Sequence, residues 1–143
     1  MWTQIKPTIE NQNNIKGKIA WFILKWFFPD AKKEETWLTV GHTVFMPPSQ
    51  FHMLGEMMAH ESVHAGQQRN WLRAIPWWIR YIASPKFRYS QELQAYQAHF
   101  NFLKERYPDK NGQNRIKIAI AKIMASPQYK GMVDATTAAN DLK

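Results

Sequence analysis

The sequence predicts a small, helix-rich α+β domain with little sheet. Four stretches carry apolar residues at helical spacing, whereas only one stretch is rich in β-branched and aromatic residues. The chain has 143 residues, of which 45% are hydrophobic and 14% aromatic. This is enough apolar material to bury one core, so we expect a single domain over residues 1–143.

Residues 1–14 are predicted to be a polar lead-in, followed by a helix over residues 15–28. In that helix, apolar residues recur at spacings of three and four until Pro29 ends the pattern. Its three lysines are expected to face water. Burial in the core is the preferred interpretation, and a basic, tryptophan-rich helix lying on a membrane surface is the alternative.

The next predicted elements are a strand and a second helix. The stretch "TWLTVGHTVFMPP", residues 36–48, is rich in β-branched and aromatic residues and is closed by two prolines, which predicts a strand. Ser49 is expected to cap a helix that begins near Gln50 and runs to Gln68.

The second half of the chain is predicted to be helical with interruptions. Residues 70–89 hold three tryptophans and are interrupted by two prolines, which predicts a short helix or an irregular excursion over the core. Ser90 is expected to cap a helix over residues 91–107. A last periodic stretch spans residues 115–125, and residues 132–143 are expected to form a loosely held tail.

Composition narrows the possible ligands and partners. Cysteine is absent, which excludes disulfides and thiolate metal sites, so any metal must be held by His, Asp or Glu. The net charge of +8 favours acidic partners, but the basic residues are scattered and predict no dedicated nucleic-acid patch. Neither a secretory signal nor an apolar run long enough for a transmembrane helix is recognised, so we expect a cytoplasmic protein.

The strongest functional signal is the HExxH motif "HESVH", residues 60–64. On a helix, His60 and His64 lie one turn apart on the same face, so both imidazoles can reach one zinc ion. Glu61 projects beside them, where a carboxylate can act as general base toward water activated by zinc. This combination predicts the chemistry of a hydrolase.

Chance and a purely structural role are the competing explanations of this motif. For five His and seven Glu in a chain of this length, roughly 0.01 chance matches are expected. A structural pair of core histidines would leave buried polar groups without partners, at about 1 to 3 kcal/mol each. We therefore expect zinc, with a third protein ligand farther along, because catalytic sites usually have three ligands and one open position.

The third ligand separates the known classes of HExxH protein. Gln67 and Asn70 stand where a metzincin would have Gly and His, so that class is excluded. The chain resembles the gluzincins, zinc metallopeptidases whose third ligand is a glutamate on a downstream helix, often followed by a small residue three positions on. In "SQELQAYQAHF", Glu92 and Ala95 match that pattern. The resemblance implies a zincin-like domain with Glu92 on the metal and an edge strand above the metal helix that holds substrate.

Three further residues are candidates for a role beside the metal. Some gluzincins carry Asp at the position of Tyr96, so a supporting role for an acid is not expected here. Tyr96 is either a donor to the oxyanion or an aromatic core residue, and Tyr89 is a second candidate donor. His99 lies seven residues after Glu92, hence on the same face, and is an alternative ligand or electrophilic helper.

Taken together, the residues predict a zinc metalloprotease that hydrolyses peptide bonds in a peptide or protein substrate. His60, His64 and Glu92 are the expected zinc ligands, Glu61 is the general base and Tyr96 assists. One alternative is a catalytically silent, zinc-stabilised binding or structural protein. Another, suggested by the positive charge, is a protease acting on nucleic-acid-associated proteins. Contact with a membrane surface stays open.

Overall fold

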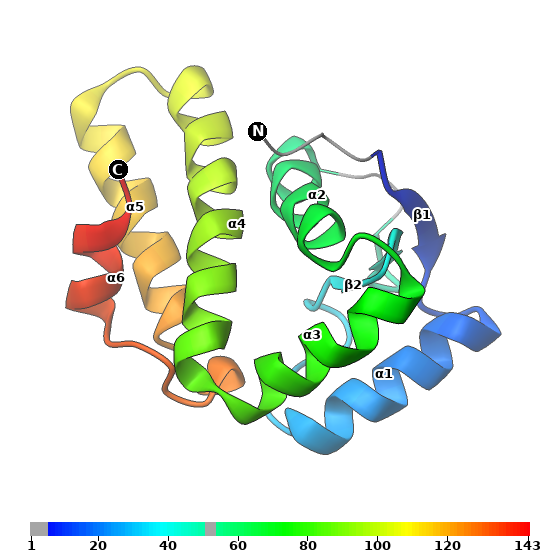
Figure 1. Cartoon of the computed structure of the whole chain (residues 1–143). Coiled ribbons are helices and arrows are strands. Elements are labelled where there is room, and N and C mark those ends of the chain that lie inside the picture. Colours follow the sequence, from blue (N-terminus) through cyan, green and yellow to red (C-terminus); the bar gives the residue numbers. More distant parts are fainter. Residues whose placement is uncertain (1–5, 51–53) are drawn as a thin grey trace.

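The computed structural model describes residues 6–50 and 54–143 and confirms the helix-rich α+β fold (Figure 1). Within these residues the chain forms six α-helices, one short 3-10 helix and three strands. None of the described helices is both long enough and apolar enough to cross a bilayer. In chain order the elements are β1 (Thr8–Asn11), α1 (Ile15–Phe27), β2 (Leu38–Val40), β3 (Thr43–Met46), α2 (Gly55–Gln68), α3 (Trp71–Ala83), α4 (Pro85–Arg106), α5 (Lys110–Met124), the 3-10 helix η1 (Pro127–Tyr129) and α6 (Ala135–Asp141).

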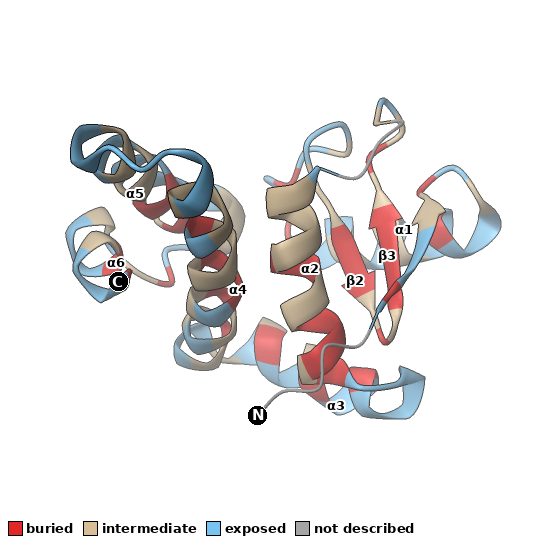
Figure 2. Cartoon of the chain, turned by 90° about the horizontal axis from the view of Figure 1, so that it is seen from above, coloured by how far each residue is buried: buried red, intermediate tan, exposed pale blue. Residues whose placement is uncertain are grey.

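Helix α2 lies between the sheet and α4, as Figure 2 shows. One side of α2 contacts β2 and β3, the other side contacts α4, and α5 and α6 lie beyond α4. The two helices approach closely at Gly55, where a Cβ atom would clash with the ring of Phe102. Because α2 is covered on two sides, polar residues in its middle are buried.

The stretch predicted to be one strand, residues 36–48, is a β-hairpin. β2 and β3 pair antiparallel with Val40 opposite Thr43, and Gly41 and His42 form the two-residue turn between them. Gly41 has a φ of 61°, a conformation that favours glycine in a hairpin turn. The single-strand prediction was wrong because one glycine between two β-branched runs is a weak turn signal.

The predicted lead-in, residues 1–14, contributes a strand to the sheet. β1 pairs in parallel with the central strand β3, which gives the order β1-β3-β2. Gln12, directly after β1, is fully buried, and its side-chain amide donates a hydrogen bond of 2.6 Å to the carbonyl of Thr36. The short polar strand was missed because its pairing partner is distant in sequence, so nothing local marks it.

Helix α1 is held at both ends and is at most half-buried between them. At its start, the Asn14 side chain accepts a hydrogen bond from the Gly17 amide, and a Cβ atom at Gly17 would lie 2.6 Å from the backbone of Gln12. At its end, Phe28 is buried in an aromatic cluster with Tyr81. The preferred interpretation of a core helix was wrong, because Gly17 is the one buried residue of α1.

The predicted start of α2 was also wrong. The helix begins at Gly55, with Leu54 as its N-terminal cap residue, whereas Ser49 lies in a turn and Gln50 is not helical. Residues 51–53, which belong to the predicted first turn, lie outside the described residues. The HExxH motif is helical as expected.

Residues 70–89 form helix α3 and the start of α4, with a break at Ser84, so the helical alternative is confirmed and the irregular excursion was wrong. The Asn70 side chain caps α3 by accepting from the Arg73 amide at 2.9 Å. Ser84 caps α4 in the same way, and proline at the first position of α4 fits because that N–H would have no helical partner. Ser90, the predicted cap, therefore lies inside α4.

The segment expected to be a loose tail, residues 132–143, packs onto α4 and α5. It contains α6, and Ala138 and Leu142 are fully buried. They join a core cluster with Phe100 of α4 and Met124 of α5. The weak periodicity of the tail misled the prediction, because seven helical residues are too few to display a clear apolar face.

Candidate metal centre

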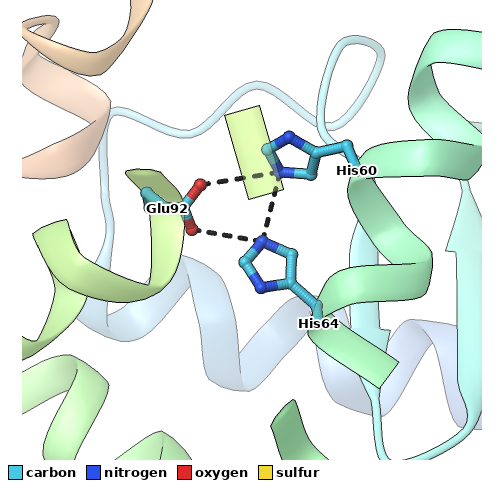
Figure 3. Close-up of side chains that lie close together, drawn as sticks. All are labelled: His60, His64 and Glu92. Atoms are coloured by element: carbon cyan, nitrogen blue, oxygen red, sulfur yellow. Dashed lines mark hydrogen bonds and ion pairs between the residues drawn. The ribbon is translucent and has the colours of Figure 1, made fainter. Parts of the chain in front are cut away.

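Two consecutive turns of α2 present His60 and His64 toward α4 (Figure 3). The spacing of four places both imidazoles on one face, and their Nε2 atoms lie 3.1 Å apart. Both residues are buried, with 4% and 7% of their surface exposed. The local helix therefore fixes two nitrogen donors side by side before any ligand is considered.

Glu92 completes the group from α4. Its Oε2 lies 3.5 Å from Nε2 of His60, and its Oε1 lies 3.4 Å from Nε2 of His64. In Figure 3 the carboxylate points directly at the two imidazoles across the space between the helices. Ala95, one turn along α4, is fully buried, as expected for a small residue where two helices meet closely.

The three groups could together hold a metal ion, and their donor set is one that zinc accepts. Ligand bonds of about 2.0–2.2 Å in a tetrahedral site place the ligand atoms roughly 3.3–3.6 Å apart, close to the 3.1 Å between the two Nε2 atoms. Each Nε2 atom also lies at such a distance, 3.5 Å for His60 and 3.4 Å for His64, from one of the two oxygens of Glu92. Glu92 Oε2 is buried without a hydrogen-bond partner among the described residues, which leaves this oxygen available as a metal ligand. Within residues 6–50 and 54–143, this is the one group of three such side chains whose donor atoms converge.

Further contacts hold two of these side chains in place. The hydroxyl of Tyr81 donates to Glu92 Oε1 over 2.5 Å, and Tyr81 itself stacks on Trp77. On the other side, His64 Nδ1 lies 2.9 Å from Gln67 Oε1. Such outer contacts orient metal ligands. Sequence analysis missed Tyr81, because nothing in the sequence places residues of α3 beside α4.

Glu61 lies next to the three converging groups but is not one of them. It is buried, and its Oε2 accepts a hydrogen bond of 2.6 Å from the hydroxyl of Thr39 on β2. The carboxylate and the three donors line the same cleft of about 360 Å³. Sequence analysis drew attention to this strand but not to Thr39, because the contact depends on how the hairpin packs on α2.

The structure separates the two candidate tyrosines. Tyr96 lines the cleft, its ring centroid lies 4.4 Å from that of His60, and its hydroxyl pairs with that of Tyr129 at 2.9 Å. Burial and the negative charge of Glu92 raise the pKa of Tyr96, so its hydroxyl stays protonated and can donate. Tyr89 instead donates to Asp141 and does not line this cleft. Tyr129, which sequence analysis missed, lines the cleft together with Tyr81 and Tyr96.

His99 also lines the cleft, but it is not part of the converging group. Its ring centroid lies 6.2 Å from that of His60. Burial, assisted by the nearby His60, lowers the pKa of His99 to about 4, so the imidazole is neutral at neutral pH. A neutral imidazole can donate or accept one hydrogen bond at the wall of the cleft.

The edge strand is less open than the resemblance implies. β2 is an edge of the sheet beside the cleft, as predicted. However, the side chain of Gln68 donates to the Thr39 carbonyl at 2.9 Å and accepts from the Gly41 amide at 2.8 Å. The Thr39 carbonyl and the Gly41 amide are therefore already bonded and not free for an extended peptide.

Without a metal ion, the charges of His64 and Glu92 depend on each other. Burial by itself lowers the pKa of His64, but the charge and hydrogen bond of Glu92 outweigh it and raise the pKa to about 9. Burial by itself raises the pKa of Glu92, but the two imidazoles outweigh it and hold this pKa well below its usual range. Without metal, the site therefore holds a proton and an ionised carboxylate at neutral pH.

This coupling predicts proton release on zinc binding. His64 must be neutral to bind a metal, so each zinc ion bound at about pH 7 should release at least one proton. The apparent zinc affinity should then rise about tenfold per pH unit from about pH 7 toward the pKa of His64. Calorimetry in buffers of different ionisation enthalpy measures the number of protons. Binding without proton release would show that the metal-free His64 is neutral.

No protein-family model, curated protein or solved structure matches this chain.

Proposed function

We propose that this chain is a zinc-dependent peptidase. One observation carries the proposal: a buried glutamate, Glu61, is held by Thr39 beside three converging metal donors but outside them, in a shared cleft. A purely structural metal site does not need a fourth side chain, a carboxylate held beside the three donors. A peptidase needs a base at this place.

Each residue has a separate part in the proposed reaction. His60, His64 and Glu92 would hold zinc, and the ion would supply a Lewis acid that acidifies water and polarises a carbonyl. Glu61 takes a proton from the attacking water and later gives it to the leaving amine. Thr39 keeps the Glu61 carboxylate aimed into the cleft.

The tyrosine pair is suited to stabilise the developing negative charge. Tyr96 and Tyr129 both line the cleft, and their hydroxyls are 2.9 Å apart. Only one of the two can donate within the pair, so the other hydroxyl hydrogen is free for the substrate oxygen. Hydrogen-bond donors aimed at an oxyanion commonly contribute about 10²–10³ in rate.

A metal site that serves only structure is the second candidate. The three donors come from α2 and α4, so a bound ion would join two layers of the molecule. The Gln68 contacts on β2 also favour this candidate, because they occupy part of the edge that would hold a peptide.

Digestion of a peptide library by the full chain tests the proposal. We expect zinc-loaded protein to cleave peptides, chelation to abolish cleavage and added zinc to restore it. Products are read by mass spectrometry. A protein that binds zinc stoichiometrically but cleaves no peptide would favour the structural role.

A further inference from the structure

Helix α1 carries an apolar stripe that faces away from the protein. With about 3.6 residues per turn, Gly17 and Leu24 lie on the packed side of the helix. The opposite side carries four large apolar residues that are 57% to 78% exposed: Ile15, Ile19, Phe22 and Trp26. Exposed apolar residues in a continuous row are unusual in a folded domain and mark a contact surface.

Helix α3 repeats this arrangement. Ala74, Trp77 and Tyr81 form its buried side. Its outer side is apolar as well, with Leu72 82%, Ile75 61% and Ile79 62% exposed. Six of the fifteen large exposed apolar residues in the described chain lie on α1 and four on α3. The apolar surface is therefore concentrated on these two helices.

A groove joins the two outer sides into one surface. It has a volume of about 570 Å³, and its walls include Ile23 and Phe27 of α1 and Ile75 and Ile79 of α3. We call the exposed apolar sides of α1 and α3, together with the groove between them, the two-helix face.

Basic residues border the two-helix face on both sides. Lys18 and Lys25 lie on the side of α1 away from the groove, and Arg73 and Arg80 lie on the side of α3 away from it. Lys25 also donates to the carbonyls of Pro29 and Ala31 at the end of α1. Neither helix contains an acidic residue.

We propose that the two-helix face binds the surface of an anionic lipid bilayer. An apolar surface that contains tryptophan, with Lys16 in the wall of the groove and further cations at the edges, matches the acyl boundary and the negative headgroups of such a surface. A second copy of the chain fits less well, because symmetric pairing would bring like charges of the two borders together. The face adjoins the metal cleft, and Leu24, Phe28 and Trp78 line both. The proposal does not rest on the peptidase activity.

Vesicle sedimentation with the full chain tests this proposal. We expect the protein to pellet with vesicles of phosphatidylcholine and phosphatidylglycerol, but much less with phosphatidylcholine alone or at high salt. Phe22→Ser with Trp26→Ser should lower partition by about tenfold or more. Lys18→Gln with Arg73→Gln should lower it roughly thirtyfold on the anionic vesicles only.

A control variant tests whether vesicle binding depends on the two-helix face or on exposed apolar side chains anywhere on the protein. Tyr107→Ser with Ile118→Ser removes two exposed apolar side chains outside the face and should leave partition unchanged. Circular dichroism confirms that every variant is folded. The proposal is overturned if wild type does not prefer anionic vesicles or if the control pair reduces partition equally. A dimer that dissociates in Phe22→Ser with Trp26→Ser, without vesicle binding, would also overturn it and identify the face as a self-association surface.

Discussion

Glu61→Gln should keep zinc and lower the rate of peptide hydrolysis by about 10²–10⁴. The glutamine oxygen can still accept the hydrogen bond from Thr39, so the side chain should keep its place. An amide, however, cannot take a proton from water. Because Glu61 lies outside the group of three metal donors, zinc content should not change. Steady-state rates and metal analysis on the same preparation measure both effects.

Glu56→Gln is the matched control for this variant. Glu56 lies on the same helix and the substitution is chemically identical, but Glu56 does not line the metal cleft. The Glu56→Gln variant should hydrolyse peptides at the wild-type rate. Equal rates for wild type and Glu61→Gln, with zinc bound in both, would remove Glu61 from the reaction.

Glu92→Ala should abolish stable zinc binding. The substitution removes one of the three converging donors. Loss of an outer contact to a metal ligand costs about 10–100-fold in affinity, and loss of a ligand itself should cost more. His99→Ala should retain zinc, because His99 is not in the converging group. Metal content after dialysis and competition with a chromogenic chelator compare the two variants.

The control for Glu92→Ala must distinguish lost coordination from lost folding. Glu92→Gln preserves the shape of the side chain and can still accept the hydrogen bond from Tyr81, so it should fold normally and bind zinc weakly. Circular dichroism of both variants without metal monitors the fold. Zinc retained by Glu92→Ala but lost by His99→Ala would make His99 the third ligand.

Local sequence patterns predicted where the helices lie better than they predicted what each helix packs against. The helical spacing of residues 15–28 identified α1, but it could not tell which way the apolar side chains face. The spacing of His60 and His64 depends on one helix alone, so their approach was predictable. The ends of the helices and strand β1 were harder to predict. Several neighbouring residues can serve as the cap of a helix, and the pairing partner of β1 is distant in sequence.

Contacts between elements account for what sequence analysis missed in the site. Glu92 was chosen through a family resemblance, and the structure brings it to the two histidines across α2 and α4. Thr39, Tyr81 and Tyr129 reach the site from β2, α3 and η1. No motif or periodicity links these three residues to HExxH, since only tertiary packing places them together.

The clamped ends of α1 have a mechanical consequence. Gly17 allows the first turn to press against Gln12, and Phe28 fixes the far end in the aromatic cluster. Helix α1 is therefore held in place at both ends. A partner that binds α1 contacts a helix that is already folded and held in place, so little conformational entropy is lost on binding.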